Sequence, residues 1–164
     1  MTQIHDMDHS YCYSCQTYEF PTSLEQSPDG IQPTGKTTEF LCPVCPDQSL
    51  EIGLISKCQV CFCNNCRGYV IDTQTLGQLI QALRSTYQGP DDRPVMIDQA
   101  ELHKTTFCPA CFEPMQTHPY HGPGNSVLDS CMGCKLSWMG HGELAKIVRA
   151  PGQRGVRVLG EFKI

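Results

Sequence analysis

Residues 42–80 read CPVCPDQSLEIGLISKCQVCFCNNCRGYVIDTQTLGQLI, and this stretch decides the fold. One Cys-x-x-Cys pair, Cys42/Cys45, opens it, and a second pair, Cys63/Cys66, follows after seventeen residues. Two thiolates at this spacing lie close enough to hold one tetrahedral metal ion, and two such pairs complete its coordination. The stretch therefore predicts a fold that is built around a metal ion.

Residues 108–148 repeat this organisation. A CPAC pair, Cys108/Cys111, is followed after nineteen residues by a CMGC pair, Cys131/Cys134. Recurrence of one pattern in a short chain is the sequence signature of a structural repeat. We call residues 42–86 the first unit and residues 108–149 the second. Each is expected to be a short antiparallel hairpin or sheet followed by an α-helix.

Helical periodicity follows the last cysteine of each unit. Apolar residues recur there at the i, i+3, i+4 spacing that is typical of one buried helix face. These residues are Leu76, Leu79 and Ile80 in the first unit and Leu144, Ile147 and Val148 in the second. We expect helices near 73–86 and 141–149, with Asp72 or Thr73 as the cap of the first.

These residues resemble the transcription-factor-IIB-like zinc-finger family, whose pattern is CPxC, an apolar stretch and then CxxCxGxWLDxGELxxL. The second unit matches through CPAC, CMGC, Trp138, Gly142-Glu143-Leu144 and Ile147. The first matches through CPVC, CNNCRGYVID, Leu76 and Leu79, with Val70 in place of the tryptophan and Thr75 in place of the glutamate. The resemblance covers over half of the chain and implies zinc binding and a ribbon-plus-helix fold. It implies no single activity, because function depends on the surfaces carried by a fold.

All twelve cysteines fall in Cys-x-x-Cys pairs, which random placement would not produce. Four of them, Cys42, Cys45, Cys63 and Cys66, are predicted to bind one Zn²⁺. Another four, Cys108, Cys111, Cys131 and Cys134, are predicted to bind a second. Four sulfur ligands saturate the ion and leave no position for a reacting water, so both sites are expected to be structural.

Two pairs remain, Cys12/Cys15 and Cys58/Cys61. Together they would form a third Cys₄ zinc site that ties the N-terminal segment to the first unit. This third zinc is the arrangement that we favour from the sequence.

Other arrangements of these cysteines stay open. A third site made of His5, His9, Cys12 and Cys15 has suitable ligands, since imidazole binds zinc well. The two pairs within residues 58–66 can also exchange roles, because both follow CPVC at permissible distances. A chain with two zinc ions and no third is the remaining alternative.

The remainder of the chain is expected to be organised around the two units. The expected segments are an acidic N-terminal segment (1–39) tied to the first unit, a first zinc ribbon with its helix (40–88), a linker (89–105), a second zinc ribbon with its helix (106–150) and a C-terminal strand or tail (151–164). Residues 16–38 are rich in Pro, Ser, Thr and Gly and are expected to be irregular loop. The predicted fold class is small α+β, in which metal supplies stability that a core with 8% aromatic residues does not.

The composition of the chain restricts the cellular location and the classes of binding partner that we expect. No apolar leader and no run of about 18 apolar residues is visible, so we expect a cytoplasmic chain without a membrane span. The formal net charge is −5, and metal-bound thiolates make it more negative, which disfavours general binding to a phosphate backbone. One basic neighbourhood remains, made of Arg149, Arg154, Arg157 and Lys163.

These features predict a non-catalytic, zinc-stabilised module that binds other proteins as an adaptor or assembly factor. A nucleic-acid-associated transcription regulator is the alternative, favoured by the family resemblance and the basic neighbourhood. A thiol redox enzyme or a zinc-dependent enzyme is the less favoured hypothesis, because no pattern of nucleophile and base is visible.

Overall fold

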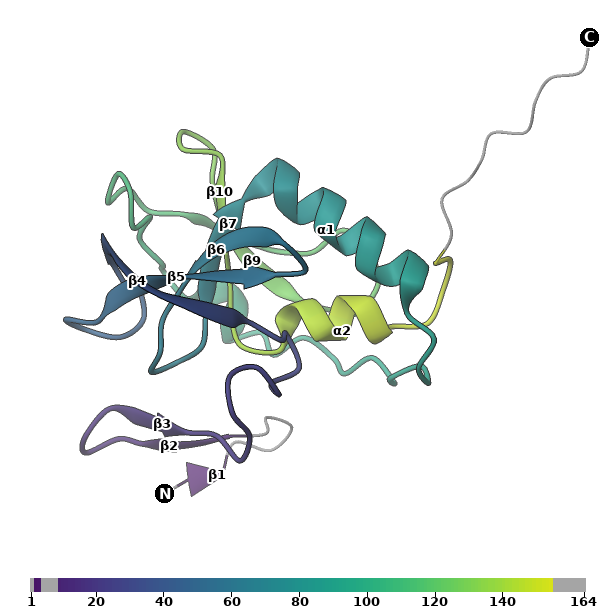
Figure 1. Ribbon diagram of the computed structural model, residues 1–164, viewed down its shortest axis with the longest axis horizontal. Coiled ribbons are helices and arrows are strands. Elements are labelled where there is room, and N and C mark those ends of the chain that lie inside the picture. Colours follow the sequence, from purple (N-terminus) through teal and green to yellow (C-terminus); the bar gives the residue numbers. More distant parts are fainter. Residues whose placement is uncertain (1, 4–8, 155–164) are drawn as a thin grey trace, which may run out of the picture.

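A computed structural model describes residues 2–3 and 9–154 of the chain (Figure 1). The strands are β1 Thr2–Gln3, β2 Ser10–Cys12, β3 Thr17–Glu19, β4 Gln32–Leu41, β5 Ser49–Ile55, β6 Cys58–Phe62, β7 Tyr69–Asp72, β8 Gln116–Pro119, β9 Val127–Cys131 and β10 Leu136–Met139. The helices are α1 Thr73–Thr86, α2 Glu143–Arg149 and the 3₁₀ turn η1 Glu101–His103. The predicted class, small α+β with mostly antiparallel strands, is confirmed.

One seven-stranded antiparallel sheet contains both units, in the order β4-β5-β6-β7-β10-β9-β8. The units meet at its centre, where β7 pairs with β10 and Val70 lies opposite Trp138. Both residues stand four positions after the last cysteine of their unit. The sequence predicted a hairpin or sheet in each unit, but it did not predict that these strands would join.

The two faces of this sheet carry two different cores. Because side chains alternate along a strand, Val60 and Phe62 of β6 face one way and Cys61 and Cys63 the other. The first face is covered by α1 and α2, which lie side by side in Figure 1. The second face carries all the predicted ligand cysteines except the exposed Cys111, packed with Val70 and Trp138. The sheet therefore separates a helix-covered core from a cysteine-rich one.

Helix α1 begins and ends where its periodicity predicted. Asp72 is its N-cap, and one carboxylate oxygen accepts a hydrogen bond of 2.8 Å from the Thr75 amide. Its apolar face, Leu76, Leu79 and Ile80, is buried as expected. This helix is thus fixed by residues within its own sequence.

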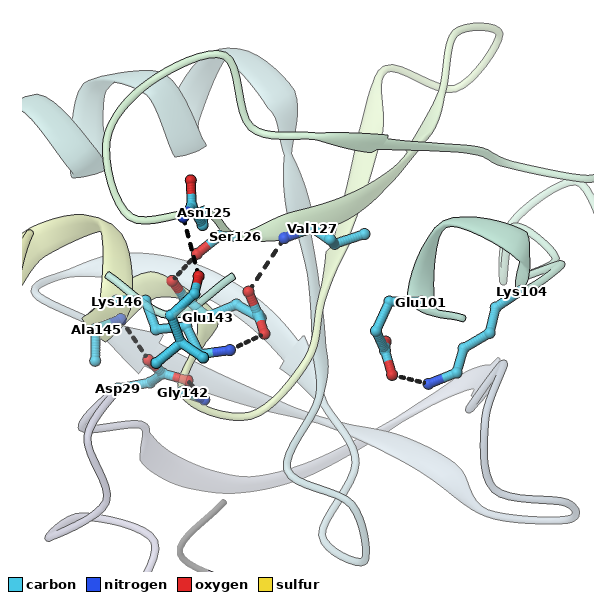
Figure 2. Close-up of polar contacts among 11 residues, drawn as sticks. Asp29, Glu101, Lys104, Asn125, Ser126, Val127, Gly142, Glu143, Ala145 and Lys146 are labelled. Carbon is cyan, nitrogen blue, oxygen red and sulfur yellow. Dashed lines mark hydrogen bonds and ion pairs between the residues drawn. The ribbon is translucent and has the colours of Figure 1, made fainter. Parts of the chain in front are cut away.

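Helix α2 begins at Glu143, two residues later than the periodicity suggested, and its first turn is satisfied from far away in the chain. The buried carboxylate of Asp29 accepts hydrogen bonds from the Gly142 amide at 2.7 Å and the Ala145 amide at 3.1 Å (Figure 2). A carboxylate at this end also complements the helix dipole. The N-terminal segment is therefore fastened to the second unit by Asp29.

The other end of α2 is held by α1. The buried guanidinium of Arg84 donates hydrogen bonds to the carbonyl oxygens of Ile147, Ala150 and Gln153. These carbonyls lie at or beyond the helix C-terminus, where backbone acceptors have no partner within the helix. A helix of seven residues is marginal alone, and here a buried polar side chain, Asp29 at one end and Arg84 at the other, stabilises each end.

The prediction of irregular loop over residues 16–38 is wrong for much of that range. Thr17–Glu19 form β3, and Gln32–Leu41 form the ten-residue edge strand β4. Its side chains are almost all exposed, and its register shifts twice against β5, so no apolar alternation marks it in the sequence. Residues 20–31 are the part of this range without a strand.

The remaining expectations concern the linker and the C-terminus. Residues 89–105 contain η1 and no strand among the described elements. The terminal strand expected within 151–164 falls mainly on residues 155–164, which lie outside the described residues. No helix in the described part of the chain is long and apolar enough to cross a membrane.

Candidate metal centres

The first unit gathers four cysteine side chains at one end of its sheet. Cys42 and Cys45 come from the turn between β4 and β5, and Cys63 and Cys66 from the turn between β6 and β7. Their sulfur atoms lie within 4.8 Å of one another, and all four side chains are buried. We call these residues the first cluster. It has the number, type and spacing of ligands that a tetrahedral metal ion requires.

The second unit gathers its four cysteines in the same manner. Cys108 and Cys111 precede β8, and Cys131 and Cys134 lie at the turn between β9 and β10. Their sulfur atoms also lie within 4.8 Å of one another. We call these residues the second cluster. Its coverage differs, because Cys111 is exposed and Cys134 is half-buried.

A left-handed residue follows the second cysteine of each pair and turns the chain back. In the first cluster Arg67 has φ 57°, and its amide donates a 2.8 Å hydrogen bond to the Cys63 carbonyl. Phe112 and Lys135 in the second cluster have φ 62° and 56°. After Cys45 the left-handed residue is delayed to Asp47, because Pro46 cannot adopt positive φ. This backbone feature marks a turn that presents two sulfurs together.

Hydrogen bonds among the crowded sulfurs shift the pKa values of the thiols in both directions. In the first cluster, hydrogen bonds from the Cys42 and Cys66 side chains lower the pKa of the Cys63 thiol to about 2. In the second, the Cys134 amide donates to the Cys131 sulfur at 3.4 Å, and this bond leads the causes that lower the pKa of that thiol to about 7. Other thiols shift the opposite way, since hydrogen bonds with neighbouring cysteines raise the pKa of Cys66 and raise that of Cys134 to about 12. A cation among the sulfurs would remove this competition for protons, because metal ions bind the deprotonated sulfur.

Asn65, between the two cysteines of its pair, connects the first cluster to the N-terminal hairpin of residues 10–19. Its side-chain nitrogen Nδ2 donates to the Gln16 carbonyl at 3.1 Å and to the Cys45 sulfur at 3.2 Å. Its side-chain oxygen accepts from the Tyr18 amide at 3.2 Å. Asn65 was not among the residues predicted from the sequence, although an amide side chain inside a Cys-x-x-Cys turn is a signal that could have suggested such a role.

Arg67 reinforces this attachment. Its guanidinium donates to the carbonyl oxygens of Thr22 at 2.7 Å and Ser23 at 3.5 Å, and it lies 4.0 Å from the centroid of the Phe20 ring. Cation–π and hydrogen-bond contacts of this kind add to one another at a partly buried site. These contacts join the N-terminal segment to the first unit.

Trp138 packs within the cysteine-rich core rather than on the surface. It is buried and belongs to the second unit, but it lies against Gly68 of the first, where an added Cβ would stand 2.4 Å from the indole ring. Gly68 therefore cannot be enlarged without moving the indole. This contact explains why the sequence places glycine after Arg67, and it ties the cores beneath the two clusters together.

Cys58 and Cys61 are not brought together as a pair. Both lie in β6, where residues three apart face opposite sides of the strand and their Cα atoms are separated by roughly 10 Å. Cys58 packs with the helix-covered core and Cys61 with the cysteine-rich core. The left-handed residues here, Ser56 and Lys57, precede the pair and form the β5–β6 turn.

The third site thus stays a prediction without support from the described residues. Within residues 2–3 and 9–154, the first and second clusters are the groups of three or more His, Cys, Asp or Glu side chains placed to share one metal ion. Cys12 and Cys15 lie at the tip of the N-terminal hairpin. His9 is described and buried, whereas His5 lies outside the described residues.

The chain matches no protein-family model, no curated protein and no solved structure. The assignment of the two clusters as candidate metal centres therefore depends on the geometry of their own cysteines.

Proposed function

We propose that this chain is a non-catalytic protein-interaction module whose two cysteine clusters each hold a structural zinc ion. Zinc is the ion that fits best, because four thiolates from two Cys-x-x-Cys turns form a closed tetrahedral site. Elemental analysis of the purified chain is expected to give two zinc ions in the clusters. Iron in their place would contradict this assignment.

A closed four-sulfur site supports a structural role for the metal. No ligand position remains at which the ion could activate water or polarise a substrate. In the tandem-ribbon organisation proposed from the sequence, each ion fixes the ends of two strand pairs. Activity of the module then depends on its surface.

The observation that carries the interaction role is an apolar rim around the second cluster. Phe107, Phe112 and Met132 are each adjacent in sequence to a cysteine of that cluster, and all three are exposed, by 50%, 69% and 79%. Exposed aromatic and methionine side chains are enriched where proteins bind other proteins. A metal-fixed turn holds such side chains in a rigid arrangement, which lowers the entropic cost of binding.

Affinity purification from the native source tests this role with a matched pair of variants. The double substitution Phe112→Ser with Met132→Ser alters the apolar rim, and Met96→Ser, at a residue that is 89% exposed in the linker, is the control. We expect a protein partner to be recovered with the wild type and with Met96→Ser, and to be lost with the rim variant. Partners that are retained equally by all three chains would contradict the proposal.

The alternative of a nucleic-acid-bound regulator is less well supported. The two described arginines of the basic neighbourhood are engaged with acids, since Arg149 lies 3.8 Å from Asp92 and Arg154 pairs with Asp91. These pairs reduce the positive charge available to a phosphate backbone. A gel-shift assay at low salt distinguishes the two functions, and we expect no shift.

A further inference from the structure

We propose that Cys12 and Cys15 form a third metal site that is half complete in one chain, and that the same pair from a second copy supplies the other two thiolates of a bridging zinc-class ion. This proposal does not depend on the adaptor role. It follows from the backbone, the exposure and the surroundings of the pair.

The backbone at this pair is that of a metal-binding turn. Gln16 directly follows Cys15 and has φ 56°, which matches Arg67, Phe112 and Lys135 after the equivalent cysteines of the two clusters. A left-handed conformation at a glutamine is uncommon and costs energy, so its recurrence at this position indicates a shared geometry. Cys58/Cys61 has the same spacing in sequence and lacks this feature.

The turn brings both cysteines to the tip of the hairpin, and Cys15 is accessible there. The Cys15 sulfur lies 2.8 Å from the Thr17 hydroxyl oxygen, which positions it at the end of the turn. Cys15 is exposed, Cys12 is half-buried, and Tyr13 between them is 69% exposed. The tip of the hairpin can therefore approach another molecule without rearrangement.

The described chain supplies two of the four ligands. The first unit holds the hairpin at Gln16, along β3 and in the loop that follows, where the Asn65 side chain and the Arg67 guanidinium bind it, and Cys15 stays exposed beside these contacts. Cys58 and Cys61 face opposite sides of β6, so they cannot serve as the second pair for this site. Within residues 2–3 and 9–154 no other His, Cys, Asp or Glu side chain is placed to complete this site, so two positions of a tetrahedral ion are left for ligands from outside that part of the chain.

A second copy is the occupant that the chemistry favours. It presents an identical pair on an identical exposed tip, and two such pairs reproduce the four-sulfur set of the intact clusters. Residues 1–30 carry five acidic residues and no Lys or Arg, so two copies of this segment repel each other without a cation between them. Association of two chains through this tip is therefore expected to require the metal.

The test uses Co²⁺ as a visible probe for the full chain whose two clusters already hold zinc. Cobalt binds thiolates more weakly than zinc does, so it reports the additional site rather than replacing the zinc in the clusters. We expect half an equivalent of Co²⁺ per chain, the absorption of tetrahedral cobalt–thiolate, and a doubling of the mass measured by light scattering.

Two variants connect the result to the residues. Cys12→Ser with Cys15→Ser is expected to lose both the cobalt spectrum and the doubling of mass, while retaining two zinc ions, which reports that the chain is still folded. Cys58→Ser with Cys61→Ser has the same number of thiols removed and is expected to behave as the wild type. If the double hairpin variant loses zinc, Cys15→Ser alone replaces it, because that side chain is exposed.

Three outcomes would overturn the proposal. One full equivalent of Co²⁺ on a monomeric chain would mean that the remaining ligands lie in the same chain. Absence of cobalt binding would mean that the pair is not a metal site. Doubling of mass that persists in the Cys12→Ser, Cys15→Ser variant would mean that another surface joins the copies.

Discussion

The first and second clusters have the same ligands and the same turns, but they differ in what covers them. Cys45 and Cys66 are 4% and 8% exposed, whereas Cys111, which corresponds to Cys45, is exposed, and Cys134, which corresponds to Cys66, is half-buried. The cysteine pattern alone does not produce this difference. Segments from elsewhere in the chain produce it.

One pair of equivalent residues explains much of the contrast. Asn65 lies between Asn64 and Cys66 in the first cluster and binds the N-terminal hairpin, whereas Gly133 holds that place in the second and has no side chain. The same side-chain amide also donates a hydrogen bond to the Cys45 sulfur. Asn65 therefore both attaches the hairpin that covers the cluster and interacts with the charge on one of its sulfurs. Two clusters with the same four cysteines can thus differ in solvent exposure because one residue in a turn differs. The first cluster is therefore covered by the rest of the chain, and the second is partly open to solvent.

The largest effect is expected from loss of a buried ligand. Cys63→Ser removes a fully buried sulfur from the first cluster, and zinc binding contributes about 10–16 kcal/mol to the folding of small zinc domains, so we expect loss of one zinc and unfolding of the first unit. Circular dichroism and elemental analysis measure both. Cys58→Ser is the control and should retain both ions.

A cysteine-to-serine substitution in the second cluster tests whether loss of a ligand there affects the fold less than it does in the first cluster. Cys111→Ser affects an exposed ligand, so we expect weaker zinc binding there with the first unit intact. Equal loss of structure in Cys63→Ser and Cys111→Ser would contradict the distinction between a covered and an open cluster.

A smaller but still large effect is expected at the junction of the helices. Arg84→Met keeps the aliphatic bulk and removes the donors to three carbonyl oxygens, so we expect a loss of about 3 kcal/mol in the free energy of unfolding. Denaturant titration measures it, with Gln81→Ala on the exposed face of α1 as the control. A change below about 0.5 kcal/mol would mean that α2 does not need this contact.

The attachment of the N-terminal segment to α2 is expected to contribute somewhat less. Asp29→Ala removes the acceptor for two helix amides and should cost about 2 kcal/mol, while Asp29→Asn retains one acceptor oxygen and should cost less. Denaturant titration of the three chains measures this order. A more stable Ala variant than Asn variant would contradict it.

The pH dependence of the same residue has a defined sign. Burial raises the pKa of the Asp29 carboxyl above its ordinary value, so folding favours its protonated form. The stability that results is present below the ordinary pKa of about 4 and is lost as the pH rises through the higher folded value. We expect the advantage of the wild type over Asp29→Asn to shrink as the pH rises from 4. An advantage that grows over this range would reverse the assignment.

The smallest effect is expected at the turn residue that distinguishes the clusters. Asn65→Gly removes three hydrogen bonds at a partly exposed site, so we expect a cost of about 1 kcal/mol and faster release of zinc from the first cluster to a chelator. Gly133→Asn is the reciprocal change, and an added Cβ there meets no atom within 4 Å, so stability should change little. Release rates that respond equally to both substitutions would contradict the role given to Asn65.

Local patterns in the sequence were enough to predict several parts of the fold. The Cys-x-x-Cys spacing predicted the ligands of both clusters, and the i, i+3, i+4 periodicity predicted α1 with its Asp72 cap. Both patterns arise from contacts within a few tens of residues. The spacing of residues along the sequence is therefore enough to predict them.

Other parts depend on partners that are distant in the chain. Asp29 and Ala145 are 116 positions apart, and the pairing of β7 with β10 also joins separate units, so neither leaves a local pattern. The strand β4 is exposed along most of its length and lacks apolar alternation. The pair Cys58/Cys61 illustrates the opposite error, since its spacing is that of a metal turn but a strand separates its sulfurs.

Time-resolved alkylation of the zinc-loaded chain in the presence of a chelator tests the unequal coverage of the two cysteine clusters most directly. Mass spectrometry of the resulting peptides assigns each modified cysteine to its cluster. We predict that Cys111 and Cys134 are modified with the rest of the second cluster well before any cysteine of the first cluster, and that chain without zinc loses this protection. Modification of Cys42, Cys45, Cys63 and Cys66 first, or at the same rate with and without zinc, would contradict the account.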